Sequence, residues 1–221
     1  MKTEKRIIDA AIRVILRQGY NKTTMQDIAN EAGFARSTIY TKWKTKEALL
    51  TDLIWAESEA YLDSWLELVE HDPNGDSLHG LYRNAILAVR QHPFIRAIYA
   101  QNQFVLGNFM HDPMVVQVTS GMLSSNTEWL RSLQTYGLIR ADLDVEILSW
   151  IEVIFRQGIF TFPINTDTHP KLDYELILEY FSTMFEQFAG TRSVAVPNAG
   201  KIALKNYVDI SKREYQQIVN D

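Results

Sequence analysis

Residues 24–43 decide the fold of this chain, and their sequence is TMQDIANEAGFARSTIYTKW. Ala29, Gly33 and Ile39 occupy the fifth, ninth and fifteenth positions of a helix-turn-helix. The small residue lets two helices approach, the glycine permits the positive φ of the turn, and the β-branched residue packs the second helix into the core. The spacing therefore predicts a helix-turn-helix whose second helix, about residues 36–43, keeps its outer face free for a DNA major groove.

The sequence on either side of this turn also predicts helices. Thr24, with Asp27 three residues later, predicts a capping box at the start of the first of the two helices. Trp43 is expected to pack inside the core. Further upstream, an amphipathic helix is expected to end at Gly19, because apolar residues follow the i, i+3, i+4, i+7, i+8 stripe. This stripe consists of Ile8, Ala11, Ile12, Ile15 and Leu16.

The charge of the chain is unevenly distributed. Residues 1–46 hold ten Lys and Arg against four Asp and Glu, a net charge of +6, whereas the rest carries −11 of the total −5. A basic N-terminal region followed by an acidic remainder predicts that the first 46 residues bind a polyanion. A disordered basic tail would show the same excess, but the helical patterning favours a folded domain.

Residues 7–50, IIDAAIRVILRQGYNKTTMQDIANEAGFARSTIYTKWKTKEALL, resemble the DNA-binding domain of the tetracycline-repressor (TetR/AcrR) family of bacterial regulators. The resemblance implies an N-terminal helix-turn-helix domain and a larger helical domain that binds a ligand and dimerises. Several positions depart from the family pattern. Ala35 stands where serine often caps the helix, Ser37 where glycine is frequent, and Trp43 where phenylalanine is usual, while Thr41 and Lys42 replace aromatic or histidine residues. We expect these departures to change which DNA sequence is bound.

The predicted DNA contacts fall into two groups. Phosphate contacts are expected at the start of the second helix and after the third, because lysines and free helix N–H groups bind anions. This group consists of Lys22, Thr23, Thr24, Gln26, Lys44 and Lys46. Contacts from the recognition helix are expected from Arg36, Ser37, Thr38, Tyr40, Thr41 and Lys42. Lys46 and Tyr40 match positions that contact the DNA backbone in the family, while Thr24 is also explained as a helix cap.

The remainder of the chain predicts a second helical region. No glycine or proline interrupts residues 45–71, which predicts a helix of about 39 Å that leaves the DNA-binding domain. Further helices are expected over about 77–91, after Pro93, and over about 113–136, 145–161 and 174–189. The fold class is therefore all-α: an N-terminal three-helix domain (1–47), a larger helical ligand-binding and dimerisation domain (48–192) and a C-terminal extension (193–221). In the extension, residues 194–200 are expected to form a linker and 201–219 a helix, with a possible capping box at Ser211 and Glu214.

Aromatic residues indicate a ligand site in the larger domain, since 21 of the 25 lie after Lys46. Small-molecule sites are apolar cavities with a few polar groups, and the resemblance implies an inducer pocket of this kind. For each single one of these side chains, packing in the core is the alternative that the composition favours. The candidate lining consists of Trp65, Tyr82, Phe104, Phe109, Met110, Met122, Asn126, Trp129, Trp150 and Phe155. Arg156 is expected to pair with Glu152 at i, i+4.

The last two long helices indicate a homodimer. Apolar residues cover more than one stripe of the helix over 174–189, so it requires burial on several sides. A second copy, paired through about 145–161 and 174–189, would supply this burial by two-fold symmetry. A dimer also matches a palindromic DNA operator. A monomeric core remains the alternative.

Several classes of function are disfavoured by the sequence. There is no cysteine, the five histidines share no metal-ligand spacing, and no phosphate-binding glycine loop or nucleophile elbow occurs. We therefore expect no enzyme, cofactor or metal site. No apolar run is long enough for a membrane span, and Asp9 and Arg13 interrupt any secretory signal, so the expected location is cytoplasmic. The function expected is that of a ligand-responsive repressor of unknown inducer, or alternatively an architectural or division-linked DNA-binding protein of the same fold.

Overall fold

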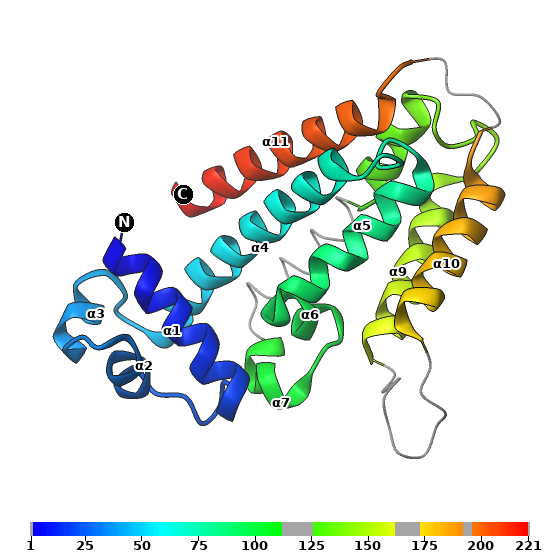
Figure 1. Cartoon of the computed structure of the whole chain (residues 1–221). Coiled ribbons are helices and arrows are strands. Elements are labelled where there is room, and N and C mark those ends of the chain that lie inside the picture. The colour runs from blue at the N-terminus through cyan, green and yellow to red at the C-terminus, as the bar shows by residue number, and fades with distance from the viewer. Residues whose placement is uncertain (1, 112–125, 162–172, 192–195, 221) are drawn as a thin grey trace. The chain divides into compact units, whose positions relative to one another are not determined.

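The structure, a computed structural model, describes residues 2–111, 126–161, 173–191 and 196–220, and for 174 and 214–220 it describes the backbone alone. Within these ranges the chain is helical, with one isolated antiparallel bridge between Ile139 and Gly190 and no strand (Figure 1). The predicted all-α class is confirmed. The described residues divide into two compact units. Unit 1 is drawn from Met1–Ala60 and His92–Thr119, and unit 2 from Tyr61–Gln91 and Ser120–Asp221.

Unit 1 contains the predicted N-terminal helices and three later short ones. Its elements are α1 (Lys2–Gln18), α2 (Met25–Ala32), α3 (Arg36–Lys42), the first part of α4 (Lys46–His71), α6 (Pro93–Tyr99), α7 (Gln103–Leu106) and the 3-10 helix η1 (Gly107–His111). α1 packs against α2, α6 and α7, and α2 packs against α3. The compact unit is therefore larger than the predicted domain 1–47, because residues 92–111 fold back onto α1.

The buried face of α1 differs from the predicted stripe. Ala11 and Ile15 are buried as expected, but Ile8, Ile12 and Leu16 are only partly buried. The other buried residues of this helix are Ile7, Ala10 and Val14. The reason is that α1 contacts both α2 and the α6–α7 segment, so a wider surface is covered than one stripe provides.

Gly19 ends α1 as predicted and also permits a close contact. Its φ is +81°, and a Cβ atom there would lie 2.3 Å from the carbonyl oxygen of Phe104. The next backbone N–H, that of Tyr20, donates to the carbonyl oxygen of Val105 at 2.9 Å. The turn after α1 is thus bonded directly to α7.

Unit 2 contains the remaining helices. They are the second part of α4, α5 (Leu78–Gln91), a helix over 126–135, α9 (Val145–Thr161), α10 (Tyr174–Ala189) and α11 (Ala199–Asn220). The expected helices over 45–71, 77–91, 145–161 and 174–189 are confirmed to within a residue at each end, whereas most of the one expected over 113–136 lies outside the described residues. α5 packs against α10, and aromatic rings fill much of the interior.

The C-terminal extension forms one continuous helix that is anchored at its start. The backbone N–H of Lys201 donates to the Asp76 carboxylate at 3.0 Å, and a Cβ atom at Gly200 would lie 2.3 Å from the Asp76 carbonyl oxygen. The expected capping box at Ser211 and Glu214 is wrong, because α11 begins at Ala199 and runs through both positions. The packed inner face of α11 buries Ser211 together with Ala203, Leu204 and Val208.

Candidate nucleic-acid interface and ligand site

The helix-turn-helix has the geometry that its sequence predicts. The Thr24 side chain accepts from the backbone of Asp27, whose carboxylate accepts from the backbone of Thr24, so both halves of the capping box are present. Gly33 ends α2 with φ +71°, and the N–H of Phe34 closes the turn on the Ala29 carbonyl at 3.0 Å. Ile39 is fully buried. α3 is therefore held by one face and leaves the other exposed.

The start of α3 lacks a side-chain cap, as the sequence indicates. Ala35 has an extended backbone and makes no side-chain hydrogen bond to the helix. Trp43 at the other end is buried as predicted, and its indole N–H donates to Asp52 at 2.9 Å. α3 therefore depends on packing more than on local hydrogen bonds.

Arg36 is an exposed cation of α3 and is oriented by its neighbour. Its guanidinium donates to the hydroxyl of Tyr40 at 2.9 Å and lies 5.1 Å from the centre of that ring. Ser37 and Thr41 are exposed, one turn apart, and Thr38 is partly buried. The Thr41 hydroxyl donates to the Thr38 carbonyl oxygen at 2.7 Å.

The lysines around α3 differ in how far they are bound by the protein. Lys42 lies 3.4 Å from Glu4 and 3.3 Å from Asp52, so two carboxylates compensate its charge. Lys44 is exposed and donates to the Tyr40 carbonyl oxygen at 2.6 Å. Its charge therefore remains available at the surface.

Thr23 and Lys46 lie inward, in contrast to the predicted phosphate contacts. Thr23 is buried and its hydroxyl donates to the Gly19 carbonyl oxygen at 2.8 Å, so it has no free surface for a phosphate. The ammonium group of Lys46 donates to the carbonyl oxygens of Tyr20 and Thr23, both at 2.9 Å. Burial lowers the pKa of Lys46, and the neighbouring Glu47 opposes this effect. Both residues hold the turn between α1 and α2.

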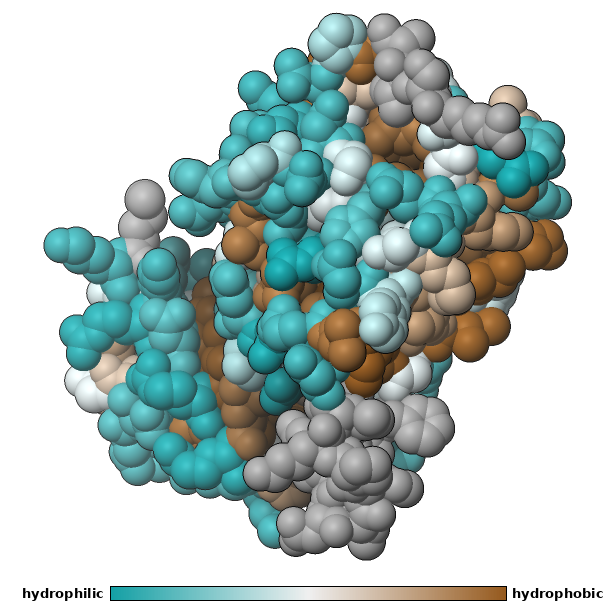
Figure 2. All heavy atoms as spheres, turned by 45° about the vertical axis from the view of Figure 1, so that its right-hand side comes forward, coloured by the Kyte–Doolittle hydropathy of each residue, from teal (hydrophilic) through white to brown (hydrophobic). Residues whose placement is uncertain are grey.

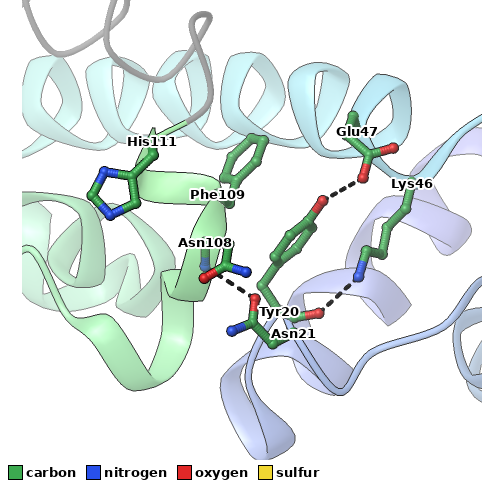
Figure 3. A pocket seen from close by; sticks show the side chains of 7 residues that line it. All are labelled: Tyr20, Asn21, Lys46, Glu47, Asn108, Phe109 and His111. Carbon is green, nitrogen blue, oxygen red and sulfur yellow. Dashed lines mark hydrogen bonds between the residues drawn. The ribbon is translucent and has the colours of Figure 1, made fainter.

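A pocket of about 550 Å³ in unit 1 shows how this turn is fixed (Figure 3). The Tyr20 ring points toward Glu47, and its hydroxyl donates to the Glu47 carboxylate at 2.6 Å, which holds the pKa of Glu47 below its usual range. The backbone N–H of Asn108 donates to the Asn21 side chain at 3.0 Å. The lining consists of Tyr20, Asn21, Lys46, Glu47, Asn108, Phe109 and His111. Several of these polar groups bond one another, so the pocket joins the turn to α4 and η1.

The remaining predicted phosphate contacts lie at the start of α2. Lys22, Thr24 and Gln26 are all exposed there. The Gln26 amide donates to Asn30 at 2.8 Å, and the Thr24 hydroxyl is used by the capping box. A lysine beside a helix N-terminus is a favourable position for a phosphate.

The predicted ligand-lining residues do not form one group. Phe104, Phe109 and Met110 belong to unit 1, where Phe104 is exposed and Phe109 packs on Tyr20 with ring centres 5.1 Å apart. Trp150 is 54% exposed, so it lines no buried site within the chain. Met122 lies outside the described residues. The members that unit 2 brings into its interior are Trp65, Tyr82, Asn126, Trp129 and Phe155, of which Phe155 is partly exposed.

These interior residues surround a buried polar cluster that includes the expected Glu152–Arg156 pair. Glu152 of α9 is 4% exposed, and its carboxylate lies 3.3 Å from the Arg156 guanidinium. Burial raises the pKa of Glu152, while Arg156 and the amide of Asn126 oppose the rise. The pKa of Tyr82 is raised well above its usual value by burial and by the Glu152 carboxylate. The expected Glu152–Arg156 pair is thus confirmed, but its position in the interior is new.

Two oxygen atoms of this cluster have no hydrogen-bond partner among the described residues. They are the Tyr82 hydroxyl and Oε2 of Glu152. Trp129 lowers the pKa of Tyr82 but forms no hydrogen bond with its hydroxyl. Buried polar atoms in native proteins nearly always have partners, so this cluster is the candidate ligand site.

Tyr207 also belongs to this region, although the sequence did not assign it to the ligand site. Its ring centre lies 6.1 Å from that of Trp65 and 5.2 Å from that of Trp129, and these two indoles lie 5.3 Å apart edge to face. Only an apolar period at Tyr207 in an otherwise separate C-terminal segment pointed toward packing. No sequence signal linked it to rings more than 70 residues away.

An exposed apolar face covers α9 and α10. Figure 2 shows hydrophobic side chains gathered over these two helices, at the right of the view. The opposite face of α10 is buried through Leu178, Phe181 and Phe185. The exposed set consists of Ile147, Trp150, Ile151, Ile154, Leu176, Tyr180, Met184 and Phe188. Contiguous apolar patches of this kind mark interaction surfaces.

The described residues contain neither a candidate metal site nor a helix that could span a membrane. No group of three or more Asp, Glu or His lies close enough there to hold a metal ion. No helix among them is both long and apolar enough to cross a membrane.

A buried helix-turn-helix core with an exposed second helix defines a DNA-binding protein. Residues 7–53 match the family model of the bacterial regulatory proteins of the tetR family. The HTH-type transcriptional regulator YvkB of Bacillus subtilis, itself uncharacterized, is 36% identical over 186 residues, which cover 83% of this chain and 95% of YvkB. The chain therefore belongs to the TetR family of transcriptional regulators, as the N-terminal motifs indicated.

Two further comparisons agree with this family. The probable acrEF/envCD operon repressor of Escherichia coli K12 is 26% identical to this chain. The aligned region covers 73% of this chain and 74% of that repressor. The structure of the regulator FadR from Bacillus subtilis, solved with stearoyl-CoA, has a TM-score of 0.58 at 20% identity and covers 81% of this chain and 96% of FadR. The latter likeness is one of fold.

Proposed function

We propose that this chain is a ligand-responsive repressor that binds a palindromic operator as a homodimer and releases it when a small apolar or aromatic inducer binds in unit 2. The exposed outer face of α3, held by a buried core, carries the proposal. Because a repressor acts on the chromosome, we place it in the cytoplasm. Relatives named as transcriptional regulators favour this function over an architectural role.

Arg36 is proposed as the main base-reading residue. The bond to Tyr40 uses one nitrogen of the guanidinium, and the other N–H groups can donate to guanine O6 and N7. Ser37 and Thr41 lie exposed on the same short helix and are proposed as its companions. Lys42 is proposed to hold α3 to its neighbours, because two carboxylates already face its ammonium group.

The phosphate contacts are proposed at both ends of the motif. Lys22, Thr24 and Gln26 offer an exposed helix start, and Lys44 an exposed charge after α3. Such contacts fix the position of the protein but carry no sequence information. Lys46 has one N–H left after its two internal bonds, so its proposed role is first structural.

The DNA part of the proposal is tested with two variants. A duplex selected by the protein from a random pool is compared with its scrambled version at two salt concentrations. Arg36→Ala is expected to lose roughly 1–3 kcal/mol on the selected duplex and little on the scrambled one. Lys44→Ala is expected to weaken both equally and to reduce the salt slope by about one. Equal losses on both duplexes for Arg36→Ala would remove it from the base-reading set.

The homodimer is proposed to form through the exposed face of α9 and α10. This face combines two adjacent helices of unit 2, and two such pairs related by a two-fold axis bury each other as a four-helix interface. In such a dimer, the Trp150 side chain is buried against the partner subunit and does not line the ligand site. Two recognition helices on one dimer match the two halves of a palindrome.

A pair of isoleucines provides a matched test of this interface. Ile151 on α9 and Ile210 on α11 are both 48% exposed. Ile151→Glu is expected to give a monomer in sedimentation, because a charge on a buried apolar interface lacks a partner. Ile210→Glu is expected to leave the dimer intact. A dimer that survives Ile151→Glu and dissociates with Ile210→Glu would place the interface elsewhere.

The inducer is proposed to act by favouring a state in which the two recognition helices no longer match the operator. A ligand shifts such an equilibrium only as far as it binds one state better than the other. Thermal shift with a panel of metabolites and drugs, paired with release of the selected duplex, tests this. A protein that no compound stabilises and that occupies many chromosomal sites would contradict the proposal.

A further inference from the structure

The interior of unit 2 holds an arrangement that restricts the chemistry of its ligand. Tyr82 and Glu152 each keep one buried oxygen without a partner among the described residues. Leaving a buried polar atom unpaired is unfavourable, because the atom has lost its hydrogen bonds to water. Phe181 links the two residues, because its ring centre lies 6.5 Å from that of Tyr82 and 3.3 Å from that of Phe155, which follows Glu152 by three residues on α9. Two such atoms in one interior indicate that a bound molecule supplies the missing hydrogen bonds.

The charge of the cluster is already balanced. The Glu152 carboxylate faces the Arg156 guanidinium at 3.3 Å, and the two side chains are 6% and 17% exposed. A cationic ligand would leave a net positive charge in this interior, where an unpaired charge is strongly unfavourable. An anionic ligand would meet the free carboxylate oxygen of Glu152. An uncharged hydrogen-bond donor avoids both of these unfavourable charge interactions.

Aromatic rings surround this polar cluster. The Tyr82 ring contacts Phe185 and Phe181, with ring centres 4.3 Å and 6.5 Å apart. The rings of Trp129 and Tyr207 lie 5.2 Å apart, and the first residue lowers the pKa of Tyr82 while the second raises it. Rings of this kind favour a flat ligand that packs edge to face or offset against them.

We propose, on the basis of the ligand-responsive function proposed above, that this cluster recognises an uncharged aromatic molecule bearing a hydroxyl or amide N–H group. The donor of the ligand binds Oε2 of Glu152, and its oxygen accepts from the Tyr82 hydroxyl. Arg156 balances the carboxylate and does not contact the ligand. The aromatic body of the ligand packs among the surrounding rings.

The C-terminal helix is a part of this site. Tyr207 of α11 completes the aromatic group with Trp65 and Trp129. α11 is held on unit 2 by the ion pairs Lys201–Glu70 and Lys212–Asp63. The residues beyond 192 therefore take part in ligand recognition through Tyr207.

Four naphthalene probes of nearly equal size separate the chemistries. Naphthylmethanol is uncharged and donates, methylnaphthalene has no polar group, naphthoate is anionic and naphthylmethylammonium is cationic. Binding is followed by quenching of the tryptophan fluorescence and by thermal shift. We expect naphthylmethanol to bind roughly tenfold tighter than each of the others, since one hydrogen bond to a charged acceptor is worth about 1.5 kcal/mol or more. Tighter binding of either charged probe, equal binding of all four, or binding of none would overturn the inference.

Variants then assign the selectivity to the cluster. Glu152→Gln is expected to reverse the preference toward naphthoate, because the carboxylate that repels an anion is removed while the positive charge of Arg156 remains. Glu146→Gln is the matched control, an exposed carboxylate on the same helix, and should retain the wild-type order. An unchanged order in Glu152→Gln would exclude the carboxylate as the recognition group.

Tyr82→Phe and Tyr207→Leu separate recognition from folding. Removing the unpaired Tyr82 hydroxyl is expected to leave the melting temperature equal or higher, while naphthylmethanol binding weakens about fivefold. Tyr207→Leu should weaken all aromatic probes together. Binding to the selected DNA duplex without any probe should persist in every variant. Loss of probe selectivity in a wild-type protein that still binds this duplex overturns the ligand class alone, whereas failure to bind the duplex overturns the proposed function.

Discussion

Lys46 allows a sharp test of whether a partly buried lysine near the recognition helix acts first on the fold or on DNA. Its ammonium group donates to the carbonyl oxygens of Tyr20 and Thr23 and lies 3.8 Å from the centre of the Tyr20 ring. Lys46→Met keeps the aliphatic length and removes all three contacts. Lys44→Met is the control, because Lys44 is exposed and makes a single bond to a carbonyl oxygen.

The size of the effect follows from these contacts. A net contribution of about 1 kcal/mol for each of two hydrogen bonds predicts a loss of about 2 kcal/mol in unfolding free energy. Water reaching the half-buried carbonyl groups reduces this value, and loss of the cation–π contact increases it. For a chain of this size the loss corresponds to a fall of about 4–8 °C in melting temperature. The exposed control should change by about 1 °C or less.

The assay compares melting temperatures without DNA and then affinities for the selected duplex at two salt concentrations. We expect Lys46→Met to melt lower than Lys44→Met and to lose affinity through the altered turn, with a nearly unchanged salt slope. If both variants melt together and Lys46→Met lowers the salt slope by about one, the structural reasoning is refuted and Lys46 is a simple phosphate contact.

Three further changes test local features of the structure. Ala35→Ser supplies the missing cap of α3 and should raise the unfolding free energy by about 1 kcal/mol in urea titrations; no gain would mean that the start of α3 is already satisfied. Tyr20→Phe removes the hydrogen bond that lowers the pKa of Glu47. The resulting loss of about 1 kcal/mol in unfolding free energy should be present above the usual glutamate pKa and should vanish as the pH falls through the lowered pKa. A cost that persists at acid pH would assign it to packing. Gly200→Ala should destabilise the protein by about 1–3 kcal/mol, because the new Cβ meets a backbone oxygen. Gly158→Ala, with open space around the new Cβ, should instead stabilise its helix by up to about 1 kcal/mol. The opposite order of melting temperatures would contradict the anchoring of α11.

Local features of the site were predictable from the sequence because neighbouring residues produce them. The capping box of Thr24 and Asp27, the positive φ of Gly33 and the end of α1 at Gly19 each depend on residues within a turn of one another. The missing cap at Ala35 belongs to the same class. Such features need no knowledge of what the helix packs against.

Side-chain environments were predicted less well because they depend on distant parts of the chain. Thr23 and Lys46 were placed at the DNA surface, yet Lys46 is bonded to residues 23 and 26 positions away. Trp150 was assigned to a ligand site and lies on an exposed face, whereas Glu152, two residues later, is buried. Trp150 and Glu152 lie on the same helix, α9. Only the elements that pack against this helix decide which of its sides is interior.

The sequence by itself determined that the chain is all-α, the bounds of its long helices over 45–71, 77–91, 145–161 and 174–189, and that its N-terminal motif belongs to a DNA-binding family, since helix caps, turns and apolar periods are encoded locally. Tertiary structure decided which cations stay free at the surface, which carboxylate is buried and which ring the last helix adds to the interior. Those outcomes arise from contacts between residues far apart in the chain, and one-dimensional periodicity does not contain them.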